Sequence, residues 1–411
     1  MKKETLFHRD FTMMIIGQIA SLFGNAIVRF ALSLYVLDKT GSAAVFGSIL
    51  AVSMIPTILI SPVGGMIADR VNRRNIMVLL DFSTAVLVFS FSLLFGRMDD
   101  SLLVGVLMVM LSIIQACYQP AVTSSIPVLV AGESLMRANG LVIQVNALAN
   151  LVGPILGGAF YGLFGLTPLV WASAVCFFLS AVMELFLHIP FVRQPKTAGA
   201  VSQAKKDFEE ALCFLTKENP HLFRLLLVIA ALNLFLTPVT TVGLPYLMKV
   251  YLGLSDTLYG FSQGALAIGS IVGGMFSGFA AKRLRFSQSH ILLVLSSLCL
   301  IPVILSVTTN AQPLLSYVVI LAAIVAFIGF ATLFNIFAQT YAQQQTPNRL
   351  LGKVASVITV VSVCATPIGQ AIYGVLFDVL HSAVFSVVLI ACLSGVLLSC
   401  LTRRFLKQCR D

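Results

Sequence analysis

The chain has 411 residues, of which 58% are hydrophobic and only 10% are charged. Water-soluble globular proteins carry about 25% charged residues, so this composition excludes an ordinary soluble globule and indicates a membrane protein. The formal net charge of +10 would fit a nucleic-acid-binding protein, but the positive residues are spread over short loops between apolar stretches, and no nucleic-acid partner is expected.

Apolar stretches recur along the whole chain, and each is long enough to cross a membrane. An α-helix needs roughly 20 residues for this, and the stretches are continuous rather than alternating, which favours helices over barrel strands. The sequence predicts an all-α integral membrane protein with twelve transmembrane helices. The predicted spans are 11–37, 43–68, 76–96, 101–127, 140–165, 168–190, 222–250, 258–281, 290–309, 314–342, 354–378 and 383–402.

Lys and Arg residues are concentrated on one side of the predicted membrane. Nearly all 26 lie in the two termini, in the loops that follow even-numbered spans, or in the segment between spans six and seven. The exceptions are Arg29, Lys39, Arg97 and Lys249. Because positively charged loops stay in the cytoplasm, both termini are predicted to be cytoplasmic.

The chain divides into six spans on each side of its longest polar segment. Within that segment, residues 202–217 predict an amphipathic surface helix with Phe208, Ala211, Leu212 and Leu215 on one face. The predicted domains are an N-terminal six-helix bundle at 1–190, a cytoplasmic linker with this helix at 191–221, and a C-terminal six-helix bundle at 222–411.

An internal repeat relates the two halves. At an offset of about 213 positions, the segment GGAFYG at 157–162 aligns with GQAIYG at 369–374. The same shift places Gly65, Ala68 and Arg70 on Gly278, Ala281 and Arg283. Two matches at nearly the same offset indicate a duplication, and therefore two pseudo-symmetric bundles.

The loop after span two is unusually rich in charge. Its arginines are explained by topology alone, but Asp69 is not, because acidic residues contribute little to orientation. Small residues one turn earlier let another helix approach, and a carboxylate at such a junction can bind a helix amino terminus or an arginine. The residues of this charged-loop motif are Gly65, Asp69, Arg70, Arg73 and Arg74.

Span five carries small residues at helical spacing. Such a pattern is typical of a packing face between helices, and a proline within a span is tolerated where neighbours satisfy the backbone. A kinked, close-packed hinge is the alternative interpretation. The residues concerned are Gly140, Gly153, Pro154, Gly157 and Gly158.

Both motifs resemble those of the major facilitator superfamily. The charged loop is similar to the family signature, with Asn72 where glycine is usual, and asparagine tolerates a left-handed backbone better than most residues. Span five resembles the antiporter motif, with Ala149 where glycine is usual. GQIASLFGNAI in span one and TGSA at Thr40 are similar to the macrolide-efflux and enterobactin-exporter branch.

This resemblance implies the major facilitator fold in a bacterial cytoplasmic membrane. It implies export by alternating access, with protons as the coupling ion. It also implies that Asp69 and Arg70 belong to a cytoplasmic latch, which forms in the outward-facing state and breaks in the inward-facing state.

Polar residues lie at helical spacing within spans one, four, seven and ten. Such groups are expensive in hydrocarbon, so they should face one another or a wet pathway. In the family these four spans line the central cavity, whereas helix-to-helix hydrogen bonds are the alternative for any one residue. The predicted cavity residues are Gln18, Asn25, Arg29, Gln115, Tyr118, Gln119, Asn233, Thr237, Thr241, Asn335 and Gln339.

Arg29 lies within a span, away from the cytoplasmic edge. Its side chain either snorkels to the outer interface or faces inward, where it would suit an anionic, zwitterionic or hydrogen-bonding substrate. The branch often has aspartate where this chain has Asn25, so a usual proton partner is missing. The remaining candidates for proton coupling are Asp81 and Glu184, although Glu184 and His188, four residues apart, also fit a surface pair.

Sequence motifs typical of enzymes either do not occur in this chain or occur where the expected local structure is missing. GFSQG at 260–264 matches a hydrolase pattern but opens a hydrophobic helix. There is no nucleotide-binding lysine loop, no zinc-protease motif and no metal-ligand spacing among the eight cysteines. No enzyme activity, cofactor or metal site is expected.

Three functions are left open. The first is proton-coupled export of lipophilic or amphipathic small molecules, and the second is transport of lysophospholipids, siderophores or other anionic metabolites. The third is a non-transporting membrane scaffold or sensor, which the short loops disfavour. The expected partners are a small-molecule substrate, protons and membrane lipid, and the chain is expected to be a monomer.

Overall fold

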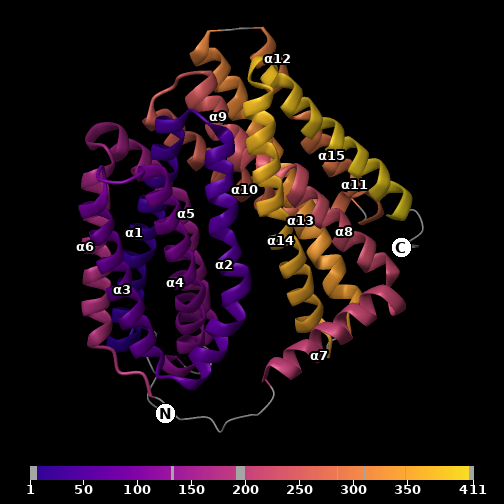
Figure 1. The fold of residues 1–411 in the computed structure, drawn as a ribbon. Coiled ribbons are helices and arrows are strands. Elements are labelled where there is room, and N and C mark those ends of the chain that lie inside the picture. Colours follow the sequence, from indigo (N-terminus) through magenta and orange to yellow (C-terminus); the bar gives the residue numbers. More distant parts are fainter. Residues whose placement is uncertain are drawn as a thin grey trace. The chain divides into compact units, whose positions relative to one another are not determined.

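The computed structural model describes residues 7–130, 134–190, 200–284, 286–309, 312–347 and 349–406, and Figure 1 shows their helices. All regular secondary structure in this part of the chain is helical. Twelve helical segments are long and apolar enough to cross a membrane. The predicted all-α fold with twelve transmembrane helices is confirmed.

The first six spans are continuous helices. Between the fifth and sixth, Gly165 has a φ of 74°, which favours glycine. These helices are α1 (Arg9–Thr40), α2 (Ala43–Arg70), α3 (Arg73–Leu94), α4 (Asp100–Leu129), α5 (Ser134–Phe164) and α6 (Leu166–Leu185).

Two of the later spans are interrupted. The seventh contains α8 (Pro220–Phe235), the π-helical η2 (Val239–Gly243), α9 (Leu244–Tyr246) and the π-helical η3 (Leu247–Tyr251), and the ninth is split into α11 (His290–Leu298) and α12 (Ile301–Thr308). Pro238, Pro245 and Pro302 lie at these interruptions. Proline removes a backbone donor and clashes with the preceding turn, which explains why the helices are interrupted there. The remaining elements are α10 (Asp256–Arg283), η4 (Phe286–Gln288), α13 (Pro313–Gln345), α14 (Leu351–Val379), η5 (His381–Ala383) and α15 (Val384–Leu406).

The linker contains the predicted amphipathic helix, as α7 (Ala200–Cys213) followed by η1 (Phe214–Glu218). Its predicted apolar face is only half used: Ala211 and Leu215 are buried, whereas Phe208 and Leu212 are exposed. Lys353 on α14 forms ion pairs at 2.8 Å with Asp207 and 2.6 Å with Glu210, which attach α7 to α14.

The chain forms two compact units, and each includes a short piece from the other half of the sequence. Unit 1 comprises Met1–Lys39, Val52–Thr197 and Ser255–Gly264. Unit 2 comprises Thr40–Ala51, Ala198–Leu254 and Ala265–Asp411. The start of α10 therefore belongs to unit 1, and the start of α2 belongs to unit 2. The predicted domain boundaries around 191–221 are not tested by this division and stay a prediction.

The repeated glycine segments explain these exchanged pieces. In unit 1, a Cβ at Gly157 would lie 2.9 Å from Phe30 of α1, and one at Gly162 would lie 3.3 Å from Asp256 at the start of α10. In unit 2, a Cβ at Gly369 would lie 2.3 Å from the backbone of α8, and one at Gly374 would lie 2.6 Å from Ala43 at the start of α2. Equivalent glycines thus make equivalent close contacts.

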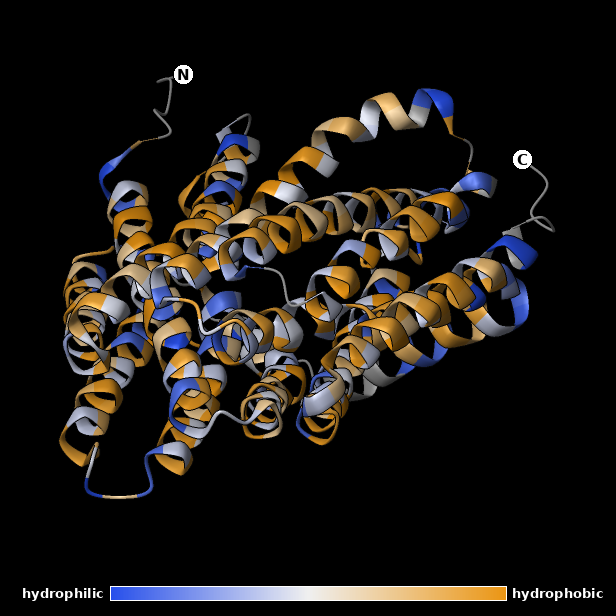
Figure 2. Cartoon of the chain, turned by 90° about the horizontal axis from the view of Figure 1, so that it is seen from above, coloured by the Kyte–Doolittle hydropathy of each residue, from blue (hydrophilic) through white to orange (hydrophobic). Residues whose placement is uncertain are grey.

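Figure 2 colours the chain by hydropathy, and the helices are largely hydrophobic. Many of their large apolar side chains are exposed. Met275 is 79% exposed and Leu163 is 72% exposed. In water such surfaces would favour aggregation, whereas in a bilayer they contact lipid. The distribution is that of a multi-pass membrane protein.

Candidate functional site

The charged-loop motif lies at the junction of α2 and α3. Asn72 is the N-cap of α3, and its side-chain oxygen accepts a hydrogen bond of 3.0 Å from the backbone N–H of Arg74. This cap is a role for asparagine that the usual glycine could not fill. The side chain of Asp69 lies outside the described residues, so its predicted role in the latch stays a prediction.

The glycine that makes a close contact here is Gly64 rather than Gly65. A Cβ at Gly64 would lie 2.4 Å from the backbone oxygen of Ala116 on α4, whereas one at Gly65 would meet nothing within 4 Å. The three arginines also differ. Arg70 is exposed, Arg73 has a buried Nε without a hydrogen-bond partner, and Arg74 donates to the backbone oxygens of Glu184 and Leu185. Arg74 therefore caps the C-terminus of α6.

The small residues of span five form close contacts at one end of the motif only. A Cβ at Gly153 would lie 2.5 Å from the Cβ of Ala26 on α1, and one at Gly158 would lie 2.6 Å from the backbone oxygen of Asp256. The backbone oxygen of Pro154 lies 3.0 Å from the position of a Cβ at Gly260. Gly140 has open space around it. The packing interpretation therefore accounts for the C-terminal part of the motif, from Gly153 to Gly158, and the hinge stays a prediction.

Arg29 is held inside unit 1 by neutral groups. Its Nε donates to Asn25 Oδ1 at 2.9 Å, and its Nη2 donates to the buried Ser112 on α4 at 3.1 Å. In the described part of the chain, no carboxylate oxygen lies within 4.0 Å of this guanidinium. Ser112 was not among the predicted residues, because serine on an otherwise apolar helix gives little signal.

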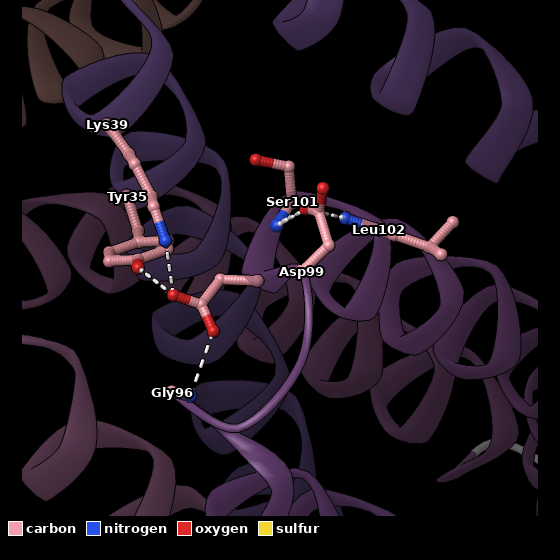
Figure 3. A network of polar contacts seen from close by, with 7 residues as sticks. Tyr35, Lys39, Gly96, Asp99, Ser101 and Leu102 are labelled. Carbon is pink, nitrogen blue, oxygen red and sulfur yellow. Dashed lines mark hydrogen bonds and ion pairs between the residues drawn. The ribbon is translucent and has the colours of Figure 1, made fainter.

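The C-terminal end of α1 shows the opposite arrangement, in which charges are paired. Figure 3 shows Tyr35 and Lys39 directed at one carboxylate, that of Asp100, whose other oxygen accepts a 2.8 Å hydrogen bond from the backbone N–H of Gly96. The Tyr35 bond measures 2.7 Å. Asp99 beside it caps α4 through the backbone N–H groups of residues 101 and 102.

The other predicted cavity residues of spans one and four have different surroundings. Gln115 donates to Gln119 at 3.4 Å. Gln18 is fully buried, and neither atom of its amide has a hydrogen-bond partner. Tyr118 is also buried, and donates to Glu184 Oε1 at 2.7 Å instead of facing an open cavity.

Both candidate proton-coupling carboxylates are inside unit 1. Asp81 is 2% exposed and accepts from Ser21 Oγ at 3.0 Å, and Glu184 is 0% exposed. The interpretation of Glu184 and His188 as a surface pair is therefore wrong, and the backbone N–H of His188 instead donates to Asp10. Among the described residues, no group of three or more His, Cys, Asp or Glu side chains could hold a metal ion.

In unit 2 the predicted polar residues line two adjoining cavities. The larger, of about 320 Å³, is lined by Asn233, Asn335 and Gln339, and the second, of about 260 Å³, shares the two asparagines and adds Thr237. Thr237 and Thr366 both donate to Asn233 Oδ1 at 3.4 Å. Thr366 lies on α14, outside the four spans considered from sequence.

Thr241, the last predicted residue of span seven, does not line either cavity. Its hydroxyl donates to the backbone oxygen of Thr237 at 3.3 Å. It lies within the π-helical turn η2, where the helical spacing assumed from sequence no longer holds.

Twelve apolar helices, an internal repeat and cavities lined in part by amides and hydroxyls define a polytopic membrane transporter. The sequence model of the Major Facilitator Superfamily matches residues 14–373. The chain belongs to this superfamily, whose members are transporters and not enzymes, and the predicted family is confirmed.

Two groups of efflux proteins are similar along nearly the whole chain. Macrolide efflux protein A of Streptococcus pyogenes is 25% identical over 384 residues, which cover 92% of each chain. Multidrug efflux pump Tap of Mycobacterium tuberculosis is 24% identical over 378 residues, covering 89% of this chain and 86% of Tap.

Solved structures share the fold. A bacterial homologue of the iron transporter ferroportin, in an inward-facing state, has a TM-score of 0.70 at 19% identity and covers 95% of this chain and 98% of its own. The nucleoside transporter NupG has a TM-score of 0.72 at 12% identity and covers 97% of this chain and 100% of its own. The major facilitator fold is thereby confirmed.

Proposed function

We propose that the protein is a secondary active exporter of amphipathic, drug-like or macrolide-like small molecules. It works by alternating access in a bacterial cytoplasmic membrane and exchanges its substrate for protons. The main support is the similarity to two efflux proteins over about nine-tenths of the chain. A fold shared with transporters of unrelated substrates would not by itself favour export.

The cavities of unit 2 support an amphipathic substrate. Asn233, Asn335 and Gln339 offer amide donors and acceptors, and the walls between them are apolar, as at Ile229 and Val354. Ligand sites of this kind combine a mostly apolar lining with a few polar groups that orient the ligand.

Arg29 supports a second candidate, a carrier of an anionic metabolite such as a lysophospholipid or a siderophore. A guanidinium held only by Asn25 and Ser112 keeps its charge uncompensated, and an anionic group on the substrate would supply a bidentate partner. A non-transporting scaffold or sensor is the third candidate, and a transport assay distinguishes it from both carriers.

The orientation and assembly belong to the same proposal. Both termini face the cytoplasm, the chain works as a monomer surrounded by lipid, and Asp69 and Arg70 form the cytoplasmic latch. The asymmetric distribution of Lys and Arg supports this orientation. A reporter enzyme that is active only in the cytoplasm, fused to either terminus, tests this orientation, and a fusion that is produced but inactive would contradict it.

Transport in everted membrane vesicles tests the function. The probes are erythromycin as a cationic amphiphile, Nile red as a neutral one and lysophosphatidylglycerol as an anionic one. We expect uptake of at least one probe when a pH gradient is imposed, and loss of uptake when nigericin collapses it. Uptake that is unchanged by nigericin contradicts proton exchange, and uptake of no probe supports the scaffold.

The Arg29→Gln variant separates the two substrate classes in the same vesicles. If the anionic class is correct, lysophosphatidylglycerol uptake falls while Nile red uptake is kept. If Arg29→Gln transports all three probes as the wild type does, Arg29 has no part in substrate binding.

A further inference from the structure

Four polar side chains from four helices form two buried hydrogen-bonded pairs inside unit 1. Ser21 on α1 donates to Asp81 on α3 at 3.0 Å, and Tyr118 on α4 donates to Glu184 on α6 at 2.7 Å. We call these four residues the carboxyl cluster, since each of its two carboxyl groups accepts a hydrogen bond from one hydroxyl group.

Each carboxyl group of the cluster lacks a partner for one oxygen. Asp81 Oδ2 and Glu184 Oε2 are buried and form no hydrogen bond. Ser180, which is also buried, donates its proton to the backbone oxygen of Gly17. Two buried negative charges with orphan oxygens are strongly unfavourable, whereas a proton on a carboxyl group removes a charge and turns an acceptor into a donor.

The surrounding groups do not supply a compensating cation. Arg74 binds the backbone oxygens of Glu184 and Leu185, and Asp10 binds the backbone of His188. From α5, the same core receives apolar side chains such as Val142 and Val145. In the part of the chain that the structure describes, no Lys, Arg or His nitrogen lies within 4.0 Å of either cluster carboxylate.

We propose that the carboxyl cluster is the proton-binding site of the transport cycle. The proposal rests on the exporter function above and locates its coupling ion. The cluster takes up and releases at least one proton per cycle. On proton uptake an O–H bond forms at one of the two orphan oxygens, Asp81 Oδ2 or Glu184 Oε2, and on release that bond breaks and leaves the carboxylate.

The cluster is separate from the place of the substrate candidate Arg29. Ser21 and Arg29 are eight residues apart on α1, which corresponds to about 12 Å along the helix axis. Proton and substrate would therefore not compete for one group. Their coupling would pass through α1, which contacts both.

Infrared difference spectroscopy of the purified full-length protein tests proton binding without transport. We expect a carboxylic-acid C=O stretching band that disappears as the pH is raised. The double variant Asp81→Asn/Glu184→Gln should lose this band. Tyr118→Phe, which keeps the ring and removes the hydroxyl, should shift its titration, whereas Tyr373→Phe, at an equally buried tyrosine of unit 2, should not.

An unchanged band in the double variant would overturn the assignment. So would a band in the wild type that responds to sodium instead of pH, because the site would then bind a metal cation. If the double variant does not fold, the shift in Tyr118→Phe against Tyr373→Phe still decides the question.

Transport by the same variants distinguishes this proposal from the exporter function. Tyr118→Phe and Ser21→Ala should lose the acceleration that a pH gradient gives to the wild type, and Tyr373→Phe should keep it. A titrating band lost in the double variant, together with wild-type transport that ignores the gradient, would contradict the proton-exchange function alone. Gradient-driven transport that persists in Tyr118→Phe and in the double variant would overturn the cluster alone.

Discussion

At the C-terminal end of α1, Lys39 and Tyr35 share the carboxylate of Asp100 (Figure 3), whereas further back on the same helix Arg29 contacts only neutral side chains. Still nearer its start, α1 contributes Ser21 to the carboxyl cluster, where Asp81 has no cation. The helix α1 thus carries a paired charge at Lys39 and an unpaired cation at Arg29, and through Ser21 it contacts an unpaired acid of α3.

This contrast runs against what stability alone would favour. A pair at an exposed end contributes little, and the Lys39 side chain is 46% exposed. Removing an ion from water costs several kcal/mol when no partner repays it. The chain pairs charge where pairing matters least and leaves it unpaired where it costs most, so the interior charges are better explained by ligands that bind and leave.

The largest expected effect on stability and transport comes from a substitution that forces α1 and α5 apart. Of the α5 glycines that face α1, Gly153 is the closest, because a Cβ there would lie 2.5 Å from the Cβ of Ala26. Gly153→Val must therefore push α5 away from the helix that holds Arg29. Overpacking of this kind costs about 1–3 kcal/mol. We expect a clearly lower melting temperature in detergent and loss of uptake for every probe.

Gly140→Val on the same helix is the matched control, because a Cβ there meets nothing within 4 Å. It should melt and transport like the wild type. Equal damage in both variants would mean that valine in α5 is harmful in itself, and the close contact with α1 would lose its significance.

A carboxylate introduced beside Arg29 should give its guanidinium a permanent counterion. In Asn25→Asp the new carboxylate occupies the place of the amide oxygen that now lies 2.9 Å from Arg29 Nε. An internal ion pair then replaces the substrate as counterion, so we expect uptake of lysophosphatidylglycerol relative to Nile red to fall about ten-fold, equivalent to about 1.4 kcal/mol. Asn25→Ser, which adds no charge, should keep the preference. An unchanged preference in Asn25→Asp would contradict the role of Arg29 in anion selection.

At the paired end, Asp100→Asn should have a smaller effect. The amide oxygen can still accept from Tyr35, but the ion pair with Lys39 is lost. We expect a melting temperature lower by a few degrees, with unchanged probe preference and an unchanged infrared titration. A loss of gradient-driven uptake would show that this end also takes part in coupling.

The sequence predicts the fold well because hydrophobic length is a strong signal. Twelve spans follow from the thickness of the bilayer, and the breaks in the seventh and ninth spans are marked by Pro238, Pro245 and Pro302. What the span pattern misses is the exchange of helix ends between the two units. That exchange depends on which residues each glycine contacts, as Gly162 contacts Asp256. The sequence of one segment does not show which distant segment packs against it.

The candidate site could be predicted only in part, because helical spacing places residues on a face without saying what covers that face. Asn233, Asn335 and Gln339 line one cavity as expected. Tyr118 has the same spacing but is buried against Glu184. The sequence pattern could not match Asp81 and Glu184 with their donors, since the two hydroxyls come from two other helices, α1 and α4.

The smallest effect is expected at Lys39. In Lys39→Gln, Asp100 keeps its bonds from Tyr35 and the backbone of Gly96, and the lost charge was already largely solvated. The change in melting temperature should be smaller than for Asp100→Asn and should shrink further as salt is added, because salt screens exposed pairs. Uptake in vesicles should match the wild type, in contrast to Arg29→Gln. If removing this paired charge impaired uptake of an anionic probe as much as removing Arg29, pairing would not distinguish structural from functional charges on α1.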